Sequence, residues 1–147
     1  MTQQEIDIRK TTEASPAAVW TLLDDSATWP AWTPIERFEL VTPRGPDGLG
    51  EVRTFKTGRV TVREEIIERV RARRLSYKLL DGLAVRHYRA EIDLTQRPDA
   101  SGTEIRWHTT FKPKLPGSGW LYRRALTKAT QQFVDGLAER AATADAV

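Results

Sequence analysis

Arg53 and Glu64 are the side chains whose types and spacing most directly suggest chemistry. Thr57-Gly58, between them, predicts a two-residue hairpin turn, because glycine tolerates the positive φ that such turns need. This turn would pair Arg53 with Val62 and place Glu64 diagonally opposite, on the same face, since side chains alternate along a strand. The same face carries the apolar residues Phe55, Val60 and Val62. Both charges are therefore predicted to point inward.

Two interpretations of this pair stay open. It could be a structural ion pair at the rim of the core, because a charge stripped of water has to be compensated. It could instead be a polar anchor in a ligand cavity, since pockets are mostly apolar with a few convergent polar groups. In the second case Glu64 could also act as a general acid or base, its pKa set by burial and by Arg53.

Aromatic residues supply the other candidates. Tyr77 and Tyr88 either donate hydrogen bonds to a ligand carbonyl or are core rings whose hydroxyls are satisfied elsewhere. The tryptophans either line a flat ligand or pack together. The candidate ligand-binding residues are Trp29, Trp32, Arg53, Phe55, Glu64, Tyr77, Tyr88, Trp107 and Phe133.

Other chemistries are disfavoured. His87 and His108 are predicted on the outer, charged face of their strands, although a slip near Val85 would turn His87 inward. Neither metal-ligand spacing nor a Ser/His/Asp arrangement is evident, so we expect no metal site and no nucleophilic hydrolase. The basic run of Arg69, Arg71, Arg73 and Arg74 is interpreted as a solvated turn. It lacks the exposed aromatics of a nucleic-acid site, so nucleic acid is not expected as a partner.

Composition indicates one ordinary domain spanning 1–147, with 39% hydrophobic and 29% charged residues. No apolar run approaches the roughly 20 residues of a membrane span. The first residues do not resemble a secretory signal, and cysteine is absent, so a cytoplasmic location is the default expectation.

Periodicity predicts the elements that must position these residues. Residues 4–12 alternate as a strand, and Ser15-Pro16 begins a short helix. A second short helical turn ends at Trp29-Pro30, and a strand spans 35–41. After the loop at 43–50, the hairpin's second strand runs to about Val70, with a possible bulge at Ile66-Ile67. Further strands follow, and an apolar stripe predicts a helix from about Gly119 to Ala142, formed by Tyr122, Leu126, Ala129, Phe133 and Leu137. Gly136 within this helix suggests close packing against the sheet.

Six consecutive strands joined by tight turns must be antiparallel. With the first strand they predict a curved seven-stranded sheet, covered by the long C-terminal helix. A helix only about 10 Å across cannot fill such a sheet alone. The space left is either packed by aromatics or open as a cavity.

Several motifs occur in a characteristic order: Ser-Pro-Ala-Ala-Val-Trp at 15–20, Trp-Pro-Ala-Trp-Thr-Pro at 29–34, Gly50-Glu51-Val52-Arg53 with Glu64, Arg74-Leu75-Ser76-Tyr77, Val85-Arg86-His87-Tyr88, Gly102-Thr103, and Trp107 before the last helix. From about residue 5 to 140 they resemble the polyketide cyclase/dehydrase (SRPBCC) family of the START-like superfamily, whose fold the birch-pollen allergen shares. The resemblance implies an α+β helix-grip fold, a deep apolar cavity, and no cofactor or metal. It does not assign chemistry, because the superfamily includes cyclases, lipid and steroid carriers and receptors.

Three functional hypotheses follow. The first is a protein that binds a small hydrophobic or aromatic molecule, polyketide-, lipid- or sterol-like, oriented by Arg53, Glu64 and a tyrosine. The second is a cofactor-independent polyketide cyclase/dehydratase with Glu64 as its acid/base. The third is a protein with a solid core that acts through its surface. The sequence leaves open the ligand, any catalysis, and whether the protein is a monomer or a homodimer.

Overall fold

A computed structural model describes residues 2–99 and 101–145. Met1, Ala100 and the last two residues of the expected 1–147 domain lie outside this description. The elements in chain order are β1 (Gln4–Thr12), α1 (Pro16–Asp24), η1 (Ser26–Ala31), β2 (Arg37–Thr42), β3 (Val52–Thr57), β4 (Val60–Val70), β5 (Arg74–Asp81), β6 (Val85–Gln96), β7 (Thr103–Pro113) and α2 (Gly119–Asp145). The predicted order is confirmed, and the second short helix, η1, is a 3-10 helix.

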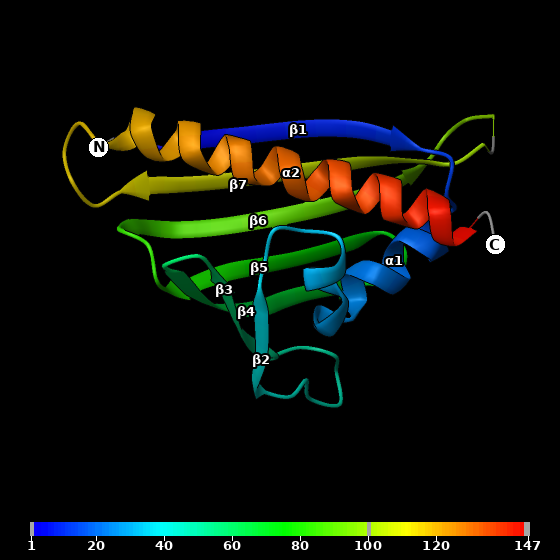
Figure 1. The fold of residues 1–147 in the computed structure, drawn as a ribbon, viewed down its shortest axis with the longest axis horizontal. Coiled ribbons are helices and arrows are strands. Elements are labelled where there is room, and N and C mark those ends of the chain that lie inside the picture. The colour runs from blue at the N-terminus through cyan, green and yellow to red at the C-terminus, as the bar shows by residue number, and fades with distance from the viewer. Residues whose placement is uncertain (1, 100, 146–147) are drawn as a thin grey trace.

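The seven strands form one antiparallel sheet in the order β1-β7-β6-β5-β4-β3-β2. The first and last strands are therefore neighbours, while all other pairs are consecutive along the chain. Figure 1 shows the sheet curving behind α2, with α1 and η1 on the same side as α2. This is the predicted α+β architecture of a curved sheet and a long C-terminal helix.

Strand alternation sets the two faces of the sheet. In β7, Ile105, Trp107 and Phe111 are buried, whereas His108 points outward to Glu5 on β1. In β6 the register shifts between Arg86 and Arg89, and His87 sits in this bulge with a φ of 54° and an exposed side chain. The slip near Val85 thus occurs, but it leaves His87 facing solvent.

The β3–β4 hairpin turns one residue later than the sequence suggested. Thr57 pairs with Val60, so Gly58 is the first central residue of the loop, with a φ of 58°, a position where two-residue loops favour glycine. Arg53 consequently lies directly opposite Glu64, not diagonally from it. The face is unchanged, because the pairing moved by an even number of residues.

The two halves of α2 pack differently. The C-terminal half is tight, with Val134, Leu137 and Ala141 fully buried. Gly136 belongs to this half, but it contacts η1 and not the sheet: a Cβ there would lie 1.8 Å from the carbonyl oxygen of Trp32. In the N-terminal half, the predicted stripe residues Tyr122 and Leu126 are only half-buried. Among the described residues, no helix is both long and apolar enough to cross a membrane.

Candidate functional site

A cavity of about 510 Å³ lies between the N-terminal half of α2 and the inner face of the sheet. Its size is within the range of small-molecule sites, about 300–1,000 Å³. Exposed residues such as Thr57, Ala125 and Gln132 are part of its lining, so the cavity opens to solvent. The expectation of a space between sheet and helix is therefore met.

The walls of the cavity are formed by residues that strand alternation and helical spacing turn toward it. Alternation along β3, β4 and β5 turns Phe55, Val62 and Tyr77 inward, while η1 contributes Trp29. The i, i+4 and i+3 spacing along α2 supplies the opposite wall, formed by Tyr122, Leu126, Ala129 and Phe133. The lining is therefore mostly apolar and rich in aromatic rings.

Glu64 is the only charged side chain that lines the cavity, within the described part of the chain. Burial raises its pKa above the ordinary value, although the Arg53 guanidinium opposes the shift. Burial also raises the pKa of the Tyr77 and Tyr88 hydroxyls, which border the same space and stay protonated. The cavity thus offers one carboxyl group and several neutral polar groups, among them the hydroxyls of Tyr77 and Tyr88.

Arg53 is fully buried and lies behind the cavity wall, not in it. Its Nη2 lies 3.1 Å from Glu64 Oε1, and its Nη1 donates to the Ser26 hydroxyl at 3.0 Å. The guanidinium stacks 4.0 Å from the Trp29 ring centroid, with Phe55 and Tyr77 also within 5 Å. Such cation–π contacts stabilise a desolvated cation. The positive charge is therefore covered by three rings that line the cavity.

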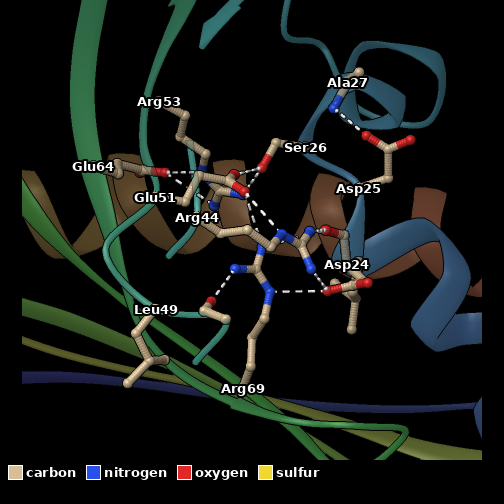
Figure 2. Close-up of polar contacts among 12 residues, drawn as sticks. Asp24, Asp25, Ser26, Ala27, Arg44, Leu49, Glu51, Arg53, Glu64 and Arg69 are labelled. Atoms are coloured by element: carbon tan, nitrogen blue, oxygen red, sulfur yellow. Dashed lines mark hydrogen bonds and ion pairs between the residues drawn. The ribbon is translucent and has the colours of Figure 1, made fainter. Parts of the chain in front are cut away.

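A second, partly buried charge cluster adjoins the first (Figure 2). Arg69 donates to Asp24 at 2.8 Å and to Glu51 at 3.0 Å. Glu51 in turn accepts from the Ser26 hydroxyl at 2.5 Å. Arg44 completes the cluster with an ion pair to Asp24 at 3.2 Å. Ser26 therefore links the cavity-side pair to this cluster.

The position of Arg69 corrects the interpretation of the basic run as a solvated turn. Its side chain is only 7% exposed, whereas Arg71 and Arg73 are exposed as expected. The β4–β5 register shifts between Ile66 and Glu68, at the predicted bulge. An extra residue reverses the alternation, so Arg69 turns inward. The Ile66-Ile67 bulge is the sequence signal for an inward Arg69, whereas no sequence signal identified its partner Glu51.

Of the predicted ligand-binding residues, six line the cavity: Trp29, Phe55, Glu64, Tyr77, Tyr88 and Phe133. Arg53, Trp32 and Trp107 do not. Trp32 and Trp107 pack against Trp29, with ring centroids 4.8 Å and 5.7 Å away, and so support the wall from behind. Of the α2 stripe only Phe133 was predicted to bind a ligand, yet Tyr122, Leu126 and Ala129 line the cavity as well.

The arrangement suits either recognition or proton transfer. A carboxyl group whose pKa is raised by burial holds its proton to higher pH than a free one and can act as a general acid or base, and tyrosine hydroxyls can donate to a carbonyl oxygen. Within residues 2–99 and 101–145, no three His, Asp or Glu side chains gather in a way that could hold a metal ion.

Comparisons with known proteins agree with this geometry. The family model for "Polyketide cyclase / dehydrase and lipid transport" matches residues 3–142. No curated protein matches the chain in sequence at a significant level.

Solved structures resemble the chain in fold at low identity. A START superfamily protein from Mycobacterium smegmatis has a TM-score of 0.80 at 13% identity, covering 93% of this chain and 96% of its own. A protein from Thermobifida fusca has a TM-score of 0.77 at 23% identity, with coverages of 93% and 92%. The di-domain aromatase/cyclase StfQ of the steffimycin pathway has a TM-score of 0.82 at 14% identity, covering 99% of this chain and 52% of that one.

Proposed function

The chain belongs to the polyketide cyclase/dehydrase and lipid transport family, and from this premise we propose that its cavity binds one small hydrophobic or aromatic molecule. The observation that carries the proposal is the open space of about 510 Å³ with aromatic walls and few polar groups. A polyketide-, lipid- or sterol-like molecule has the apolar surface to match these walls. The proposal keeps the cytoplasmic location expected from the sequence.

The polar groups of the cavity restrict the charge that a ligand can carry. Glu64 presents an acceptor to the cavity, while the positive charge of Arg53 is held behind the rings and already bound to Glu64 and Ser26. A ligand carboxylate or phosphate beside Glu64 would meet a like charge without a free cation. The favoured ligand is therefore neutral, with a hydroxyl directed at Glu64 or a carbonyl directed at Tyr77 or Tyr88.

A binding assay tests this proposal. The neutral fluorophore 1-pyrenemethanol should enter the cavity, and its affinity should fall by about tenfold or more in Ala129→Trp, whose new ring occupies the space. Lys128→Trp, on the outer side of the same turn, is the matched control and should bind like the native chain. Equal binding by Ala129→Trp and native protein would refute the cavity as the site.

A second candidate function is a cofactor-independent cyclase/dehydratase, favoured by the raised pKa of a carboxyl group that lines the cavity. In such a reaction Glu64 would take a proton from a carbon next to a ketone, and a tyrosine hydroxyl would donate to the enolate oxygen. The enolate carbon would then attack a second carbonyl, forming the ring bond, and the proton held by Glu64 would pass to the new alkoxide.

Glu64→Gln separates the two functions, because glutamine keeps the shape but cannot exchange the proton. An enzyme should lose turnover of a poly-ketone substrate, whereas a binding protein should keep its affinity for 1-pyrenemethanol within about threefold. Turnover that survives in Glu64→Gln would exclude Glu64 as the acid/base.

A further inference from the structure

The most exposed large apolar side chains of the described chain cluster around the start of α2. Leu115 is 60% exposed, Trp120 63% and Leu121 55%. The other four tryptophans are all buried, at 7% exposure or less. Burial of large apolar side chains is favourable, so such a cluster marks an interaction surface.

Positive charge surrounds these side chains. Residues 112–128 contain five cations and no acid: Lys112, Lys114, Arg123, Arg124 and Lys128. All five are exposed, and no acid of the described residues lies within ion-pair distance of them. The formal net charge of the chain is +3, so this segment makes the rest of the chain net negative. We name Leu115, Trp120, Leu121 and these five cations the α2 patch.

Helical geometry places the patch outward. At about 100° per residue, Trp120 and Arg124 lie opposite the stripe that lines the cavity, and Leu121 and Lys128 lie on the flank of the helix between the two. Trp120, Arg123 and Arg124 border a groove against β1, in which Asp7 pairs with Arg106 and Glu5 contacts His108. Asp7 is thus engaged by Arg106, and the five patch cations outnumber the one remaining carboxylate of this groove, that of Glu5.

The patch lies beside the mouth of the cavity. The Lys114 amide donates to the carbonyl of Ala84, a cavity-lining residue in the β5–β6 turn. The loop before α2 and this turn lie at the same end of the sheet (Figure 1). The β4–β5 turn, with Arg71 and Arg73, lies at the opposite end.

We propose that the α2 patch docks the protein on an anionic lipid bilayer. Tryptophan and leucine side chains insert at the boundary between headgroups and acyl chains, and the surrounding cations bind anionic headgroups. Scattered apolar residues separated by charges suit this boundary better than a dry protein interface, whose centre excludes charge. The inference does not depend on what the cavity binds, although docking here would bring its mouth to the bilayer.

Sedimentation with vesicles tests the proposal on the unliganded full chain. The protein should pellet with vesicles of phosphatidylcholine mixed with phosphatidylserine and remain free with phosphatidylcholine alone. Bound protein should also show reduced acrylamide quenching, because Trp120 is the exposed tryptophan. Arg123→Gln/Arg124→Gln should weaken the association by about thirtyfold, as loss of two interfacial cations implies.

The matched control is Arg71→Gln/Arg73→Gln, which removes the same charge at the far end of the sheet. It should bind anionic vesicles within about threefold of the native chain. Equal weakening by both double variants would overturn the proposal in favour of non-specific attraction. It would also be overturned if the native chain did not pellet with anionic vesicles. A dimer in solution that protected Trp120 from acrylamide without lipid would overturn it as well.

Discussion

Arg53 and Arg69 are neighbouring buried arginines that are both paired with glutamates, yet the acids they bind have different surroundings. Arg69 binds two carboxylates and the carbonyl of Gly48, which ties the end of α1 and the loop before β3 to β4. Arg53 has one carboxylate partner, Glu64, which borders the cavity. The first is a cluster closed on itself; the second leaves a carboxyl group available to a ligand. Two similar buried ion pairs can therefore have different roles, depending on whether the carboxylate faces other protein groups or a cavity.

Removing Arg69 should have the largest effect. Arg69→Met would leave Asp24 with Arg44 alone and the buried Glu51 with only the longer, 3.8 Å ion pair to Arg44, and breaking a buried charge pair typically costs about 3–5 kcal/mol. Urea denaturation should show this loss in the free energy of unfolding. The control Arg71→Met, on the exposed turn, should change it by less than about 0.5 kcal/mol. An unchanged free energy of unfolding in Arg69→Met would contradict the structural role of the cluster.

Arg53→Met should cost less, about 2–3 kcal/mol, because Glu64 can be protonated when its partner is lost. The loss should grow as the pH rises, since ionised Glu64 would then be buried without a counter-charge. Unfolding free energies measured across pH test this. A loss that is larger than that of Arg69→Met and constant with pH would show that the two pairs are equivalent.

Ser26→Ala should have a smaller effect, about 1–2 kcal/mol, by removing the hydroxyl that connects the two clusters. A double-mutant cycle of Arg53→Met and Arg69→Met gives the coupling between them. The cycle should show coupling in the native background and little in Ser26→Ala. Coupling that is undiminished in Ser26→Ala would exclude Ser26 as the link.

The smallest effect is a pH dependence. Because the folded-state pKa of Glu64 is raised by burial, its contribution to stability is fully present below the unfolded pKa of about 4.3 and is lost as the pH rises through the folded value. Native stability relative to Glu64→Gln should therefore fall over this window. A relative stability that rises with pH would mean that Arg53 outweighs burial and lowers the pKa.

The sequence predicted much of this architecture, because strand alternation and helical periodicity are local patterns. They placed Arg53 and Glu64 on the inner face and both histidines on the outer face. They could not show that Arg53 lies behind the rings. Alternation predicts which face of the sheet a side chain is on, but not whether its end group reaches the cavity. They also did not distinguish the two parts of the α2 stripe: its residues from Tyr122 to Phe133 border the cavity, whereas Leu137 is fully buried. The inward orientation of Arg69 could be predicted only by combining strand alternation with the bulge at Ile66-Ile67.

The central claim is that Glu64 faces the ligand while Arg53 does not, so the cavity prefers neutral molecules. Its most direct test compares the affinities of 1-pyrenemethanol and 1-pyrenecarboxylate, above the Glu64 pKa that the pH series locates. The alcohol should bind at least about tenfold more tightly than the carboxylate, and Glu64→Gln should reduce this preference. Equal or tighter binding of the carboxylate by the native chain would contradict it.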